Sequence, residues 1–110
     1  MKTRVLAATA SVAGMLMLSA AQASDALDLA KKSGCMACHS VETKIVGPAW
    51  KDVAARYKGE EGARALLIEK VQKGGKGNWA EMTGGVPMPP YSPRVADADI
   101  EKLVDFVLSL

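Results

Sequence analysis

The sequence has few of the residues that most protein chemistry needs. Its 110 residues include one histidine, two cysteines and one phenylalanine. Two cysteines cannot build the multi-bridge framework of a small disulfide-rich protein. Together with the single histidine they supply three ligands, fewer than the about four that a structural zinc site needs. No carboxylate pair and no nucleophile beside a base can be identified, so we do not predict an enzyme.

An excess of charge of one sign is also lacking. The chain has 14 basic and 12 acidic side chains, a formal net charge of +2. Lys2 and Arg4 account for that excess, and without them the two signs balance. A balanced chain gives no reason to expect binding to nucleic acid or to an anionic membrane surface.

The N-terminal residues have the pattern of a secretion signal. A basic start is followed by an uncharged run over residues 5–18, and a small-x-small cleavage pattern ends at Ala23. We predict that residues 1–23 are a signal peptide that is removed, leaving residues 24–110 as one domain in the periplasm. An uncleaved membrane anchor is the alternative, but the run is shorter than the roughly 20 residues of a spanning helix. We therefore expect no stable membrane insertion after cleavage.

The most informative stretch is Cys35-Met36-Ala37-Cys38-His39. Two cysteines separated by two residues and followed by histidine form the signature of covalent haem attachment. Each thiol can add across one haem vinyl group, and the two-residue gap lets one short turn reach both edges of the ring. The next residue then lies under the ring, where an imidazole can coordinate iron. We expect one haem c, attached through Cys35 and Cys38, with His39 as an iron ligand.

Two other kinds of site use a CxxC pair. A thioredoxin-like dithiol needs a βαβ setting, and no strand pattern lies near Cys35. A zinc half-site would need further ligands that the chain does not supply. Cysteines of an exported protein are usually oxidised, bound to metal or attached to haem. Haem attachment is therefore the favoured interpretation.

The remaining pattern predicts an all-α domain without strands. Apolar periodicity predicts about four helices, over residues 24–32, 49–57, 60–73 and 97–110. We expect Ser24 to be the N-cap of the first helix and Gly34 its left-handed stop. Four of the five prolines fall within residues 78–93, so we expect no regular element there. A structureless loop of this length usually has a function.

The second axial position of the iron needs a different residue, because His39 is the only histidine. Methionine is the natural candidate, since a thioether ligand raises the reduction potential. Met88 lies between prolines in Val86-Pro87-Met88-Pro89-Pro90, which restricts the backbone on both sides. Met36 lies between the cysteines, and Met82 is followed by a flexible stretch and is expected to fill the core. We assign Met88 as the second ligand, with a polyproline recognition segment as the alternative.

Three blocks of the sequence together resemble a known family. Cys35 to His39, then Val46-Gly47-Pro48-Ala49-Trp50-Lys51-Asp52-Val53-Ala54-Ala55, then Val86 to Pro90, are similar to a class I c-type cytochrome. The small bacterial cytochromes c551/c552 (the c8 type) are the closest match in pattern. The resemblance implies a small class I cytochrome c fold, with about four helices wrapped around one covalently bound haem. It also implies His39 and Met88 as the axial ligands.

The resemblance assigns roles to further residues around the haem. It implies that the Pro48 carbonyl accepts a hydrogen bond from the second nitrogen of His39, which would fix the ring. Pro48 also suits a helix start. Trp79 resembles the tryptophan that reaches a haem propionate, although it stands further from the methionine than in the family, and ordinary core packing is the alternative. We expect Trp50 to pack near the haem and Phe106 to pack against the first helix.

An iron held from both faces by protein has no open position for a substrate, but it can gain and lose one electron. We therefore expect a periplasmic mono-haem cytochrome c that carries single electrons between a donor and an acceptor protein, as a monomer or in transient complexes. The alternative is the haem c subunit of a periplasmic oxidoreductase, with residues 81–85 as a docking loop. A thiol–disulfide or ligand-sensing protein is a third hypothesis. Five lysines are candidates for a ring around the haem edge, with solvated surface preferred: Lys31, Lys32, Lys44, Lys73 and Lys76.

Overall fold

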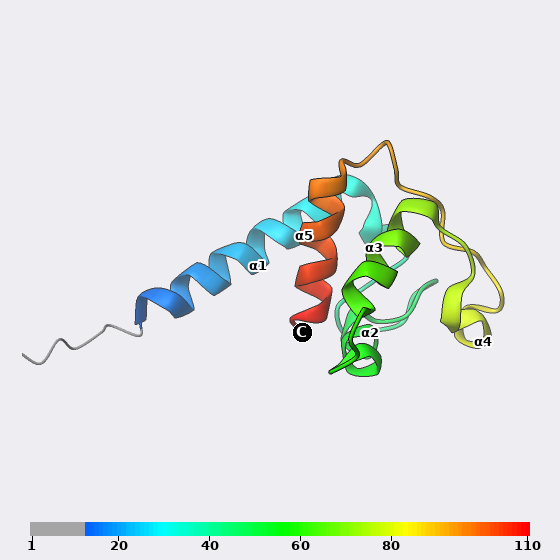
Figure 1. The fold of residues 1–110 in the computed structure, drawn as a ribbon, viewed down its shortest axis with the longest axis horizontal. Helices are drawn as coiled ribbons and strands as arrows, with labels where there is room; N and C mark the ends of the chain where they lie inside the picture. Colours follow the sequence, from blue (N-terminus) through cyan, green and yellow to red (C-terminus); the bar gives the residue numbers. More distant parts are fainter. Residues whose placement is uncertain (1–12) are drawn as a thin grey trace, which may run out of the picture.

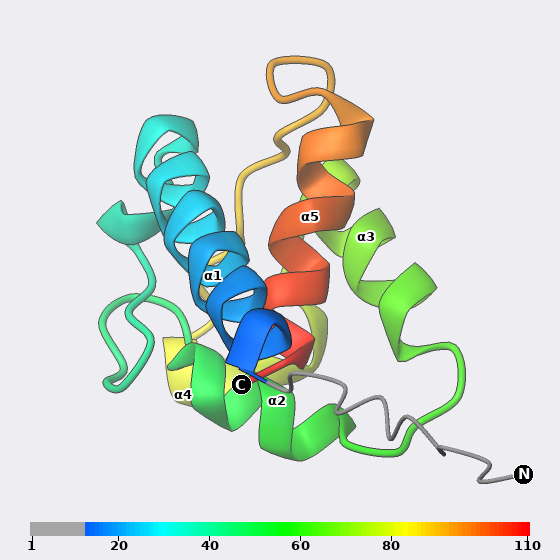
Figure 2. The ribbon, with the colours of Figure 1, turned by 90° about the vertical axis from the view of Figure 1, so that its left-hand side faces the viewer.

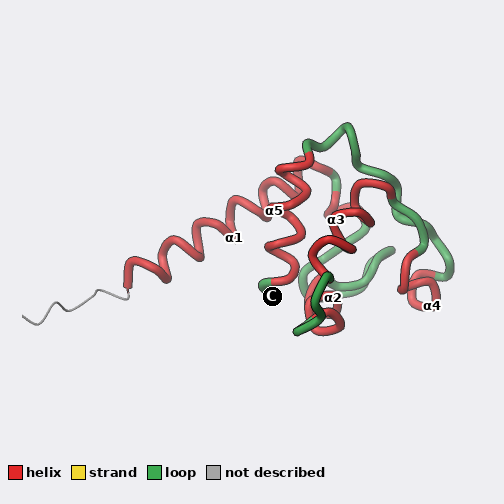
Figure 3. Tube along the Cα trace, in the orientation of Figure 1, coloured by secondary structure: helices red, strands yellow, loops and turns green. Residues whose placement is uncertain are grey.

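The computed structural model describes residues 13–110. Its helices are α1 (Ala13–Ser33), α2 (Trp50–Tyr57), α3 (Ala63–Lys73), α4 (Ala80–Thr83) and α5 (Asp97–Leu108), with two 3₁₀ turns, η1 (Cys35–Ala37) and η2 (Gly77–Trp79). No strand occurs within this described part of the chain (Figure 3). The all-α prediction is confirmed. The basic start of the predicted signal lies outside the described residues.

Helix α1 is longer than the sequence predicts. The helix begins at Ala13 and runs through Ser24, so the prediction that Ser24 caps its start is wrong for the uncleaved chain. The residues before Ser24 are rich in alanine, the best helix former, so nothing there stops the helix. Its first turns extend away from the other helices (Figure 1). Among residues 13–110, no helix combines the length and apolar character needed to cross a membrane.

Helix α5 is the centre of the packing. It lies between α1 and α3 (Figure 2) and also contacts α2. Ile100, Leu103, Val104 and Val107 follow the predicted helical spacing, and all four are buried. Burial of each such side chain contributes about 1.5–3 kcal/mol. Phe106 packs, as predicted, against the cluster that contains α1 residues.

Helices α2 and α3 lie close to their predicted positions. The α2 face formed by Trp50, Val53 and Tyr57 is buried. Helix α3 begins at Ala63, three residues later than predicted, because Gly62 takes a positive φ of 82° and interrupts the backbone just before it. Gly74 follows the last residue of α3, which therefore ends at Lys73, as the predicted range 60–73 has it.

The segment of residues 78–93 contains more regular structure than predicted. Residues 77–79 form η2 and residues 80–83 form α4, so the prediction of no regular element there is wrong. The first proline of this segment is Pro87, and the Ala-Glu-Met stretch before it favours helix. Gly84, with φ of 66°, ends α4. The additional residues 81–85 therefore form one helical turn and its stop.

Candidate functional site

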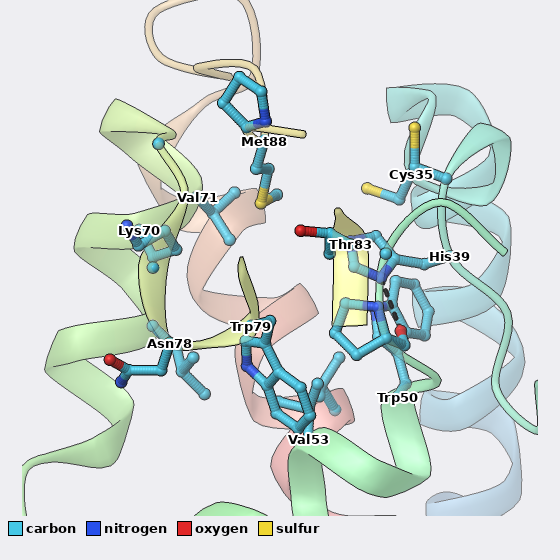
Figure 4. A pocket seen from close by; sticks show the side chains of 18 of the residues that line it. Cys35, His39, Trp50, Val53, Lys70, Val71, Asn78, Trp79, Thr83 and Met88 are labelled. Carbon is cyan, nitrogen blue, oxygen red and sulfur yellow. Dashed lines mark hydrogen bonds between the residues drawn. The ribbon is translucent and has the colours of Figure 1, made fainter. Parts of the chain in front are cut away.

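A single cavity of about 340 Å³ gathers all six residues that the sequence predicts for the site. Its lining includes η1, the loop before α2, α3, the segment from η2 to Tyr91, and α5. Figure 4 shows the side chains around it. The volume falls in the range of about 300–1,000 Å³ that is typical of cofactor sites. The predicted site residues in the lining are Cys35, Cys38, His39, Pro48, Trp79 and Met88.

One wall of the cavity holds His39 in a fixed orientation. Its Nδ1 lies 2.9 Å from the Pro48 carbonyl oxygen, the partner that the resemblance implies. With Nδ1–H donating to that carbonyl, Nε2 is left with its lone pair available to a metal. The ring also stacks on Trp50, with 5.8 Å between centroids and 27° between planes. The imidazole is therefore oriented by a hydrogen bond and by packing.

The two cysteines lie on the turn that follows α1. Gly34 has a φ of 85°, and the chain enters η1 directly after it. The backbone N–H groups of Cys38 and His39 both donate to the Cys35 carbonyl, at 3.2 and 3.0 Å. This tight turn keeps both thiols, which form no disulfide, beside the same cavity. Burial raises the pKa of the Cys35 thiol.

Met88 lies across the cavity from His39 and points into it (Figure 4). Its backbone is bound to the end of α3: the Gly75 N–H donates to the Met88 carbonyl at 2.9 Å, and the Met88 N–H donates to the Gly75 carbonyl at 3.0 Å. Further on, the Tyr91 N–H donates to the Val71 carbonyl at 3.0 Å. The proline-flanked methionine is thus held by α3 as well as by its own restricted backbone.

Trp79 lies in the cavity wall and also packs against the main core cluster, so the structure is consistent with both interpretations of this residue. It is half-buried, and the Arg56 guanidinium lies 4.8 Å from the centre of its ring. The same guanidinium donates to the Asn78 carbonyl at 3.2 Å, and the Asn78 amide donates to the Tyr57 hydroxyl at 3.2 Å. These contacts tie the η2 segment to α2 beside the cavity.

Residues 15–110 match the sequence model of the family described as Cytochrome c. The chain belongs to the cytochrome c family. It is 56% identical over 84 residues to cytochrome c-551 of Allochromatium vinosum, covering 76% of this chain and 84% of that protein. It is 47% identical to cytochrome c-552 of Nitrosomonas europaea over 110 residues, covering 100% of this chain and 99% of the relative.

Solved structures agree with this membership. The crystal structure of wild-type Nitrosomonas europaea cytochrome c552 aligns with a TM-score of 0.68 at 49% identity, covering 76% of this chain and 98% of that one. The predicted class I cytochrome c fold is therefore confirmed. As a c551/c552-type cytochrome c, the chain carries haem c and is an electron carrier rather than an enzyme.

The cavity fits such a cofactor in chemistry as well as in size. Val46, Leu66 and Val86 are 41%, 47% and 50% exposed, and all three line the cavity. Large apolar side chains exposed around one cavity indicate a surface that an apolar partner covers. Two thiols and an oriented imidazole at its edge are the groups that covalent haem attachment requires.

Several lining residues of this cytochrome were missed at the level of sequence. Tyr57 had a signal, since it stands seven residues after Trp50 on the same helical face. Leu66 belongs to the apolar pattern of the predicted helix over residues 60–73, which does not mark it as a site residue, and Lys70 had no signal at all. Lys76 is the one candidate of the five proposed lysines that lines the cavity, whereas Lys73 pairs with Glu69 at 2.9 Å.

Proposed function

We propose that this cytochrome c is a periplasmic shuttle that carries single electrons between a donor and an acceptor redox protein. In this proposal, Cys35 and Cys38 would hold the haem covalently, and His39 and Met88 would supply the two protein ligands of its iron. The observation that carries the proposal is the placement of His39 and Met88 on opposite sides of the cavity whose edge bears both thiols (Figure 4). When bound, the haem supplies a one-electron redox centre.

The protein's part in this function is to hold both ligands still and to exclude water. The Pro48 carbonyl fixes the tautomer and direction of the His39 ring, which increases its strength as a ligand. The two hydrogen bonds to Gly75 fix the Met88 backbone before the thioether binds iron. The weak iron–thioether bond therefore does not have to offset the entropy cost of ordering this segment. The mostly apolar lining limits solvent access and favours the less charged, reduced state.

Export is part of the proposal. Residues 1–23 would direct the chain to the periplasm and be removed, which leaves residues 24–110 and shortens α1 at its N-terminal end. The part of α1 that would remain still includes Ala26 and Ala30, the buried residues that contact the rest of the domain. Cleavage would therefore leave the packing around the cavity intact.

Partners of the shuttle would meet the cavity mouth in a small, transient contact. Exposed Val46 and Val86, together with Lys76, surround the cavity there. A small apolar centre with a charged rim suits brief association and release. The proposal includes no binding to nucleic acid and no stable oligomer.

The haem c subunit of a periplasmic oxidoreductase remains the second candidate. The observation in its favour is α4, a helical turn beside the cavity that is half-buried at Met82 and exposed at Glu81. Co-purification with a larger catalytic subunit would identify this role. A stable single chain that exchanges electrons with purified redox proteins would identify the shuttle.

The ligand assignment can be tested with two methionine variants. We expect Met88→Ala to remove the methionine-to-iron charge-transfer band of the oxidised protein and to lower the reduction potential, because the thioether is lost. Met82→Ala is the matched control, since Met82 is also half-buried and lies six residues away. A parent-like oxidised spectrum in Met88→Ala, or a lost band in Met82→Ala, would contradict the assignment.

A further inference from the structure

The backbone at the end of α3 comes unusually close to the Met88 segment. Gly74 follows the last residue of α3, and its N–H donates to the Lys70 carbonyl at 2.7 Å. Its φ and ψ of 71° and −161° lie in a region that only glycine adopts readily. Gly75, the next residue, makes the pair of backbone hydrogen bonds with Met88.

A side chain at position 74 has no room. A Cβ built on Gly74 would lie closest to the Met88 carbonyl oxygen, and 2.8 Å from both the Pro89 carbonyl carbon and the Pro90 nitrogen. Real Cβ atoms essentially never come that close to other heavy atoms. These are backbone atoms between prolines, which cannot turn aside as the end of a flexible side chain can.

The position of the Met88 backbone therefore depends on the backbone of Gly74 and Gly75. The hydrogen bonds with Gly75 hold Met88 against α3, and the absence of a side chain at Gly74 lets the two backbones approach. A methyl group at position 74 would push the Met88 carbonyl away from α3 and strain the bond between Gly75 N–H and that carbonyl. The Cα of Met88 would move with this carbonyl, because the flanking prolines restrict the backbone on both sides, and the start of the side chain would shift with it.

We propose that Gly74 is a positioning residue for the Met88 thioether. Its missing side chain sets how far Met88 reaches into the cavity, and so how well the sulfur meets the iron. This inference rests on the proposed function, which makes Met88 an axial ligand. Gly74 itself touches neither the haem nor a redox partner in this account.

The test compares Gly74→Ala with Gly62→Ala in the haem-loaded protein. Gly62 lies at the other end of α3, has a positive φ of 82°, and a Cβ there would meet nothing within 4 Å. It therefore places an alanine at a positive φ without the contact with Met88, and its ψ of −3° makes the backbone cost lower there than at Gly74, where ψ is −161°. For this reason the comparison is made on the iron's ligand readouts and not on stability. The readouts are the methionine-to-iron charge-transfer band and the dissociation constant of imidazole, which competes with methionine for the oxidised iron.

We expect Gly74→Ala to weaken or lose the charge-transfer band and to bind imidazole roughly tenfold more tightly than Gly62→Ala, because crowding displaces the ligand segment. Gly62→Ala should keep the parent's band and imidazole affinity. Equal bands and equal imidazole constants in the two variants would overturn the inference.

Two further variants keep the outcome interpretable. If Gly74→Ala does not accumulate, the double variant Gly74→Ala/Pro90→Gly lets the loop move aside. This double variant should still bind imidazole more tightly than the single variant Pro90→Gly does. Equal affinity in that pair would also overturn the inference. Met88→Ala separates the two claims: if it leaves the band intact, the ligand assignment fails. If it removes the band while Gly74→Ala does not, only the role of Gly74 fails.

Discussion

Replacing Gly47 with alanine tests how tightly the protein holds the His39 ring. A Cβ at Gly47 would lie 2.5 Å from His39 Cε1, 2.9 Å from Nδ1 and 3.0 Å from Nε2. The ring cannot easily move away, because Nδ1 is bonded to the Pro48 carbonyl at 2.9 Å and Trp50 stacks on it. The added methyl group must therefore displace either the ring or the loop.

The expected cost follows from these contacts. Overpacking a tight site lowers the free energy of unfolding by about 1–3 kcal/mol. Weakening the hydrogen bond between His39 and Pro48 lowers it by about 0.5–1.5 kcal/mol more. A loss of 1 kcal/mol lowers the melting temperature of a domain of this size by roughly 4–8 °C. Thermal and guanidinium unfolding of the haem-loaded protein would measure the loss, and voltammetry would report any change in reduction potential from the tilted imidazole.

Gly59→Ala is the control for this experiment. Gly59 has a φ of 73°, and a Cβ there would meet nothing within 4 Å. Its backbone cost, about 1–2 kcal/mol, is one that Gly47→Ala does not share, because Gly47 has no positive φ. The two variants are therefore compared by reduction potential, which Gly59→Ala should leave unchanged. A Gly47→Ala protein with the parent's melting temperature and potential would refute the view that this glycine is required beside the ring.

Three further changes test the packing around the site by denaturant or thermal unfolding. Leu103→Ala should lower the free energy of unfolding by about 2–5 kcal/mol, because Leu103 is 5% exposed; a loss below 1 kcal/mol would contradict its place in the core. Tyr57→Phe should cost about 0.5–1.5 kcal/mol through the lost 3.2 Å hydrogen bond from Asn78, and no change would show that this bond does not contribute. Arg64→Ala should leave the melting temperature unchanged, because its 2.7 Å ion pair is exposed on both sides; a clear drop would mean that the pair does more than the structure suggests.

Features that depend on neighbouring residues could be predicted from the sequence. The CxxCH pentapeptide and the proline-flanked Met88 can each be recognised from a stretch of only a few residues. Residues of both motifs line the cavity. The 3.6-residue period over residues 97–110 likewise predicted a helix, and the four apolar residues at that spacing in α5 are all buried. These patterns record local geometry, so one sequence is enough to interpret them.

Features that depend on tertiary contacts could not be predicted. The pairing of Gly75 with Met88 joins residues 13 positions apart, and no local signal identifies it. Leu66 is apolar and helical but faces the cavity rather than the protein core, and a period cannot distinguish these two environments. The short α4 spans only residues 80–83, and the prolines that follow from Pro87 onward indicate an irregular segment, so no helical period identifies it. The start of α1 at Ala13 could not be predicted, because the expected helix began at residue 24, after the predicted signal peptide.

Covalent haem attachment is decided by the intact mass of the protein after export and denaturation. We expect the mass of residues 24–110 plus one haem, retained under conditions that extract a haem bound only through its iron. A mass without haem would contradict covalent attachment through Cys35 and Cys38, and a mass that still includes residues 1–23 would contradict the proposed signal peptide.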